Sequence, residues 1–113
     1  MSDDLDLLRG TLDLFILKAL TWGPMHGLAV LRWIDRITDS RLRIEEGALY
    51  PALHRMEQKG WLSAEWGMTD NNRRAKFYRL TNRGRKQFAT HLSIWERYIQ
   101  AAAMVLSARG AAT

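Results

Sequence analysis

The last quarter of the chain, from Thr81 to about Ser107, limits the possible folds most strongly, because its apolar side chains repeat with the spacing of a coiled coil. They step by 4, 3, 4, 3 and 4 residues in the order Phe88, Leu92, Trp95, Ile99, Ala102 and Leu106. A second apolar stripe lies beside the first, at Ile94, Tyr98, Ala101 and Val105. At 1.5 Å per residue this helix is about 40 Å long, which is longer than a domain of 113 residues is expected to cover.

Both stripes need a partner surface, and a second copy of the chain is the simplest one available. The sequence therefore predicts a homodimer in which this helix supplies most of the interface. The predicted dimerisation residues are Leu12, Phe88, Leu92, Trp95, Ile99 and Leu106.

Three shorter helices are predicted before the long one. The first runs from Thr11, its expected N-cap, to about Trp22, where Gly23-Pro24 stops it. The second fits Gly27 to Ile37, and His26 at its start is expected to cap or pack rather than to act as a base. The third fits Glu46 to Lys59, with Gly60 at the position of a C-terminal cap.

After Gly60 the apolar period changes from that of a helix to that of a strand. Trp61–Trp66 and Ala75–Leu80 are both rich in aromatic residues and typical of strands. The residues Asp70-Asn71-Asn72 between them suit a turn, so the two strands are predicted to form a hairpin. Trp22, Trp33, Trp61 and Trp66 are interpreted as core or edge packing.

The net charge of +5 is unevenly distributed along the chain. Residues 1–60 hold 8 basic and 9 acidic side chains, for a balance of −1, whereas residues 61–113 hold 9 and 3, for +6. The hairpin and the start of the last helix, residues 71–86, contain seven basic residues and no acid. Such a segment suits the neutralisation of several phosphates.

The order of three helices, a basic hairpin and a long helix predicts a mainly α fold with a small β-hairpin. It is the order of a winged helix-turn-helix, with a DNA-binding domain at residues 1–80 and a dimerisation helix and tail at residues 81–113. In this class a helix enters the roughly 12 Å major groove while a basic hairpin reaches the phosphates or the minor groove.

Three segments resemble the PadR family of transcriptional regulators, in its short form with a single C-terminal helix. They are Leu12–Leu20 followed by Gly-Pro-Met-His-Gly at 23–27, the stretch 47–60 with Gly-Ala-Leu-Tyr-Pro-Ala-Leu, and Tyr-Arg-Leu-Thr-Asn-Arg-Gly at 78–84. The resemblance covers roughly residues 9–106. It implies a dimeric repressor that binds double-stranded DNA at a palindromic operator, often released by a small effector.

The predicted DNA-contacting residues come from the outward face of the third helix and from the hairpin. They are Tyr50, His54, Arg55 and Gln58 on the helix, and Asn71, Asn72, Arg73, Arg74 and Lys76 on the hairpin. Arg73 or Arg74 is expected to reach the minor groove, and Gln58 suits adenine. Arg79 is interpreted as a solubilising charge, and the same alternative is open for Lys76.

The resemblance also implies a place for a flat, apolar effector. In the family a Trp on the last helix can line a pore between the subunits, and Trp95 is the residue at that position, with Phe15 and Ile99 as further contacts. Leu8 and Asp13 complete the proposed walls. The alternative for Trp95 is packing in the dimer seam.

Several classes of protein are excluded or disfavoured. The chain has no Cys, so a disulfide scaffold or a cysteine-based metal site is excluded. His26, His54 and His91 lack metal-ligand spacing, and there is no phosphate loop or nucleophile motif, so no metal, cofactor or enzymatic activity is expected. The longest apolar run, Ala101–Leu106, is far below the roughly 20 residues of a membrane span.

The acidic start Met1-Ser2-Asp3-Asp4 is unlike a signal peptide, so a cytoplasmic protein is expected. A different function remains open because Glu45 and Glu46 precede the third helix, where phosphate would repel them unless they read cytosine. That alternative is a dimeric protein-interaction module on a winged-helix fold that lacks specific DNA binding.

Overall fold

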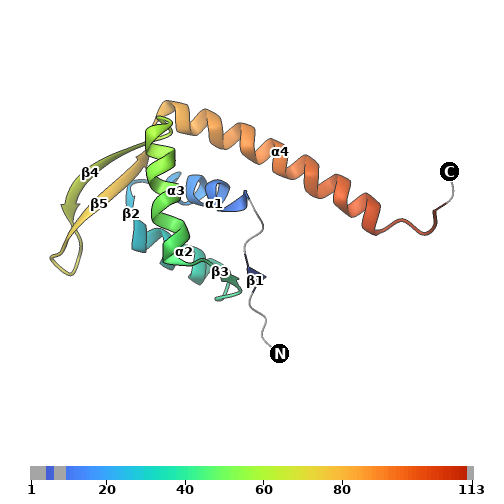
Figure 1. Ribbon diagram of the computed structural model, residues 1–113, viewed down its shortest axis with the longest axis horizontal. Helices are drawn as coiled ribbons and strands as arrows, with labels where there is room; N and C mark the ends of the chain where they lie inside the picture. Colours follow the sequence, from blue (N-terminus) through green and yellow to red (C-terminus); the bar gives the residue numbers. More distant parts are fainter. Residues whose placement is uncertain (1–4, 7–9, 112–113) are drawn as a thin grey trace.

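The computed structural model describes residues 5–6 and 10–111 of the 113-residue chain. Its main elements are α1 (Thr11–Leu20), α2 (Gly27–Ile37), α3 (Glu46–Gln58), β4 (Leu62–Met68), β5 (Arg74–Leu80) and α4 (Asn82–Leu106). Three two-residue strands are also present: β1 (Leu5–Asp6) before α1, β2 (Met25–His26) between α1 and α2, and β3 (Leu42–Arg43) between α2 and α3. This arrangement confirms the predicted mainly α fold with a β-hairpin wing and a long final helix (Figure 1).

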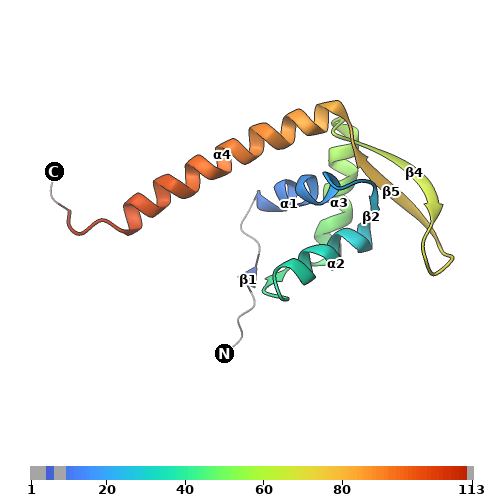
Figure 2. The same ribbon diagram turned by 180° about the vertical axis from the view of Figure 1, so that it is seen from behind.

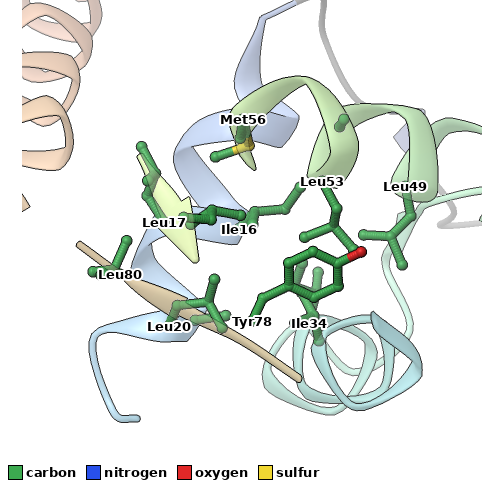
Figure 3. Close-up of a cluster of buried hydrophobic side chains, with 13 residues drawn as sticks. Ile16, Leu17, Leu20, Ile34, Leu49, Leu53, Met56, Tyr78 and Leu80 are labelled. Carbon is green, nitrogen blue, oxygen red and sulfur yellow. The ribbon is translucent and has the colours of Figure 1, made fainter. Parts of the chain in front are cut away.

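The core lies where α1, α2 and α3 meet the strands of the wing. Figure 3 shows α1 and α3 facing each other across it, with Ile34 of α2 and two residues of β5 closing the cluster. The labelled side chains are Ile16, Leu17, Leu20, Ile34, Leu49, Leu53, Met56, Tyr78 and Leu80, and each is at most 8% exposed. The stripe of Leu49, Leu53 and Met56 predicted for the third helix is therefore the buried face of α3.

The wing is a three-stranded sheet in the order β2-β5-β4, with both pairs antiparallel. The β4–β5 ladder runs from Leu62 opposite Leu80 to Met68 opposite Arg74. Strand β2 was not predicted, because two residues beside a Gly-Pro break are too few to show an alternating pattern. Its pairing of His26 with Phe77 fixes the start of α2 against the wing.

His26 caps α2, one of the two roles expected for it, and Thr81 caps α4. The His26 Nδ1 accepts a hydrogen bond from the Ala29 amide at 3.2 Å, and the Thr81 hydroxyl accepts one from the Gly84 amide at 3.0 Å. The prediction that Thr11 caps α1 is wrong. Gly10 occupies the cap position with φ of 86°, so the helical backbone begins at Thr11, which is buried as its first residue.

The interpretation of the tryptophans as core or edge packing is wrong for two of them. Trp22 is 69% exposed and Trp66 is 61% exposed. Each is covered by a cation instead, with the Lys18 ammonium 5.1 Å from the Trp22 ring and the Arg74 guanidinium 4.7 Å from the Trp66 ring. Aromatic periodicity alone does not distinguish a core contact from a stacked cation.

Helix α4 begins inside the body of the molecule and ends outside it (Figures 1 and 2). Gly84 is buried, and a Cβ there would lie 2.1 Å from the Trp61 carbonyl oxygen, so the first turn fits only with glycine. Phe88 packs against the core. Farther along, exposure rises to 64% at Tyr98 and 85% at Leu106, so the outer half of α4 has little of its own chain to cover it.

Candidate nucleic-acid interface

The outward face of α3 carries all four of the residues predicted for it. Tyr50, His54, Arg55 and Gln58 are exposed, whereas Leu49, Ala52, Leu53 and Met56 on the opposite side are buried. Pro51 lies within the helix, as its sixth residue. The helix thus presents a polar strip along its whole length, which is what a helix in the major groove requires.

A groove of about 870 Å³ separates the wing from the first turns of α2 and α3. It brings together five of the predicted DNA contacts, namely Tyr50, Asn71, Arg73, Arg74 and Lys76. His54, Arg55, Gln58 and Asn72 are not among its lining residues. Gln58 is the last residue of α3, eight positions or about 12 Å along the helix from Tyr50.

The groove also contains Arg32, which the sequence reasoning did not select. Arg32 projects from α2 and is exposed, so it adds a cation to the wall that faces the wing. Its place on the polar face of the second predicted helix was a weak signal in the sequence. The tertiary contact that turns this face toward the wing comes from β2, which was not predicted.

Backbone hydrogen bonds close the turn at the tip of the wing. The Thr69 amide donates to the Arg73 carbonyl at 2.8 Å, and the Asn72 amide donates to the Thr69 carbonyl at 2.9 Å. Asn72 has a φ of 62°, a conformation that asparagine tolerates better than most residues. Arg73 and Arg74 are both exposed beside this turn, and Arg74 is the one stacked on Trp66.

Two of the predicted cationic contacts are paired inside the protein. The Arg55 guanidinium bonds to the Asp13 carboxylate of α1, and the Lys76 ammonium lies 3.0 Å from the Glu57 carboxylate of α3. The hydrogen bond to Glu57 raises the pKa of Lys76 above its usual 10.5. These pairs tie α3 to α1 and to the wing, and DNA phosphates would have to compete for both cations.

Two neighbouring groups complete the local electrostatics. Arg79 donates to the Ser63 hydroxyl at 3.0 Å across the hairpin, in line with its interpretation as a surface residue of the wing. Burial raises the pKa of the Tyr78 hydroxyl above its usual 10.0. Tyr78 also lines the groove, below Lys76.

The two acidic residues at the start of α3 are both exposed. Glu45 occupies the N-cap position without a side-chain cap bond, and Glu46 lies in the first turn. A carboxylate at this end of a helix is favourable, because the amide groups there carry partial positive charge. Glu46 therefore has a structural role that needs no base contact.

The residues proposed for effector binding belong to α1 and to the middle of α4. Phe15 is half-buried against the core, Trp95 is half-buried and Ile99 is 45% exposed. Asp13 is engaged with Arg55, and Leu8 lies outside the described residues. Farther out, Tyr98, Ala101, Ala102, Val105 and Leu106 line a shallow apolar hollow of about 440 Å³.

Among residues 5–6 and 10–111, no cluster of three or more His, Asp or Glu side chains is placed to hold a metal ion. In that same part of the chain, no helix combines the length and the apolar character needed to cross a membrane.

The three-helix core, the hairpin wing and the exposed polar face of α3 define a winged helix-turn-helix protein of the DNA-binding class. A family model described as the transcriptional regulator PadR-like family matches residues 16–90, which are 75 of the 113 residues. The chain belongs to this PadR-like family. The members are transcriptional regulators, which confirms the prediction that the protein is not an enzyme.

Solved structures of transcriptional regulators agree with this placement. A transcriptional regulator from Clostridium thermocellum is 29% identical, with a TM-score of 0.77 over 84% of this chain and 92% of the other. A PadR family regulator from Eggerthella lenta is 28% identical, with a TM-score of 0.74 over 89% and 86%. A protein of Lysinibacillus sphaericus described as uncharacterized is 28% identical over 80% of this chain and 83% of its own length.

Proposed function

We propose that this PadR-like regulator is a cytoplasmic, homodimeric repressor that binds a palindromic operator with α3 and the wing. The observation that carries the proposal is the groove in which Tyr50 of α3 faces the wing cations Arg73 and Arg74. A helix that reads base edges and a basic hairpin that binds phosphate then act on adjacent parts of one duplex.

Each part of this face has a distinct role in the proposal. Tyr50, His54, Arg55 and Gln58 lie along the major groove, and Gln58 reads an adenine. Asn71, Asn72, Arg73 and Arg74 contact the backbone, with one arginine entering the minor groove. Lys76 joins them if phosphate displaces Glu57, its partner at 3.0 Å.

The proposed dimer explains the palindrome. A two-fold axis between two copies of α4 places the two α3 helices in equivalent half-sites, so the operator repeats in inverted order. The support is the exposed apolar surface of α4, where Ile99, Val105 and Leu106 are 45%, 73% and 85% exposed. We place the effector, a small planar apolar molecule, at Trp95, Phe15 and Ile99 beside this axis.

The alternative, an interaction module without specific DNA binding, rested on the acids before α3. The helix N-terminus accounts for Glu46. The Arg73 side chain at the wing tip is exposed, and within residues 5–6 and 10–111 no salt bridge to it is observed. A polyanion is the partner that this charge distribution fits best.

The test is a fluorescence titration of the protein against the promoter upstream of its own gene and against random duplex of equal length. We expect specific binding about 10³-fold or more tighter than random binding, and affinities that fall steeply with salt. Equal affinity for both duplexes together with little salt dependence would overturn the proposal.

A further inference from the structure

Gly27, the first residue of α2, is buried, and one side chain accounts for its nearest neighbours. A Cβ built at this position would lie 2.7 Å from Cε1, 3.1 Å from Cζ and 3.2 Å from the hydroxyl oxygen of Tyr50. The phenol ring of Tyr50 therefore rests on the bare backbone of Gly27, at the junction of α2 and α3.

The backbone itself gives no reason for a glycine here. Gly10, Gly23 and Gly60 have φ values of 86°, 133° and 80°, a region that other residues rarely adopt, whereas Gly27 has helical geometry. At Gly84 the close neighbour is a main-chain carbonyl of the core, which cannot move. At Gly27 the close neighbour is the far end of a side chain that is 47% exposed.

We propose that Gly27 is a positioning residue for DNA recognition, because it provides the seat that holds the Tyr50 phenol in one orientation. This inference rests on the proposed function. The seated ring faces the groove lined by Arg32, Arg73 and Arg74, so its hydroxyl is in place before DNA arrives. A side chain that is already ordered loses less conformational freedom on binding, which strengthens the complex.

One methyl group at position 27 is expected to weaken DNA binding without lowering the stability of the fold. Alanine is a better helix former than glycine, and the ring that it meets is free to turn toward solvent. Gly27→Ala is therefore expected to fold with an unchanged or higher melting temperature. The displaced ring no longer presents its hydroxyl in the groove, so operator binding weakens.

The experiment compares four proteins: the wild type, Gly27→Ala, Tyr50→Ala and the double variant. For each, thermal unfolding is recorded and the dissociation constant is measured for the operator and for random duplex. We expect Gly27→Ala to weaken operator binding about 2- to 10-fold, with a smaller effect on random DNA. In the Tyr50→Ala background, Gly27→Ala is expected to have no further effect, because the ring through which it acts is gone.

A second measurement examines the contact without DNA. In protein with labelled tyrosine rings, an NMR cross-peak is expected between the Gly27 α-protons and the Tyr50 ring in the wild type. A missing cross-peak, unchanged operator binding by Gly27→Ala, or an equal loss in the Tyr50→Ala background would each overturn the inference. If the wild type shows no preference for any operator, the proposed function fails and the recognition role of Gly27 fails with it, even when the cross-peak is present.

Discussion

The wing and the outer half of α4 both extend from the body of the molecule, but their surfaces are opposite in character (Figure 1). Residues 71–86, from the tip of the wing through β5 to the start of α4, carry seven cations and no acid. The outer half of α4 instead exposes apolar side chains, up to 85% at Leu106. Within residues 5–6 and 10–111, the tip of the wing and the outer half of α4 are both exposed.

The physical cost of that exposure differs between the two. Water solvates a cation well, so the wing is stable as it stands and binds a polyanion only when one is present. A continuous apolar strip is not solvated and favours permanent burial. The radius of gyration, 16.6 Å, exceeds the roughly 13 Å of a compact chain of this length, so α4 contributes surface that one chain cannot fold over.

The largest effect is expected from a charge placed on the apolar strip. Ile99→Glu would bury an unpaired carboxylate in the proposed dimer interface, and we expect the dimer dissociation constant to rise by about 100-fold or more. Light scattering coupled to size exclusion should then report a monomer at micromolar concentration. Operator binding should fall as well, since both half-sites are no longer engaged together.

Met104→Glu is the matched control. Met104 is 74% exposed but lies on the opposite side of the helix from Ile99, at about 140° around the axis. The same charge there should leave the dimer intact. If both variants become monomers, or neither does, the apolar strip is not the dimer interface.

The next largest effect is expected from the wing. Arg73→Ala combined with Arg74→Ala should weaken binding to operator and random DNA alike, by about 10-fold or more at low salt. The slope of log affinity against log salt should fall by up to about 1.8 for each subunit of the proposed dimer, because each lost phosphate contact contributes about 0.9. The measurement is a salt series of titrations with both duplexes.

Arg97→Ala combined with Arg109→Ala removes the same charge from α4 and its tail. Both residues are exposed and lie outside the wing. An unchanged slope in this control, beside a lowered slope in the wing variant, would assign the phosphate contacts to the wing. Equal slopes in the two variants would mean that only net charge matters.

The repetitive parts of the fold were predictable from the sequence, and the short contacts between them were not. Helical spacing located α2 from Gly27 to Ile37 and α3 from Glu46 to within one residue of its end. Strand β2 was missed because two residues contain no period. The N-cap of α1 was placed one residue too late. Gly10 adopts the cap position with a positive φ, which glycine tolerates, so Thr11 is already helical despite the general preference for threonine as a cap.

For the candidate site, the sequence predicted which faces are polar but not how the charges pair. The exposed strip on α3 follows from the positions of Leu49 and Leu53. The pairing of Arg55 with Asp13 spans 42 residues, and that of Lys76 with Glu57 spans 19, so neither follows from local spacing. Whether each candidate residue touches DNA stays a prediction.

A smaller effect is expected from releasing a charge that is paired inside the body. Asp13→Asn should free the Arg55 guanidinium for phosphate, making the salt slope steeper by at most about 0.9 for each subunit of the proposed dimer and strengthening random binding a few-fold. Asp39→Asn removes an equal charge from the loop after α2 and should not change the slope. If Asp13→Asn behaves like that control, Arg55 is out of reach of phosphate.

The smallest effect concerns the contact between the wing and α3 at alkaline pH. Folding raises the pKa of Lys76, through its hydrogen bond to Glu57, and the pKa of Tyr78, through burial. Above about pH 10 the unfolded chain therefore holds fewer protons at these groups than the folded chain does, so their contribution to the free energy of unfolding decreases as pH rises further. Below pH 10 that contribution is constant.

Glu57→Gln removes the main cause of the raised pKa of Lys76 and should make the alkaline decline in the urea midpoint less steep, while Tyr78 still contributes its part. An equally steep decline in Glu57→Gln would show that the pairing of Lys76 does not hold the wing to α3, and the wing would then have to be treated as attached by its sheet and core contacts alone.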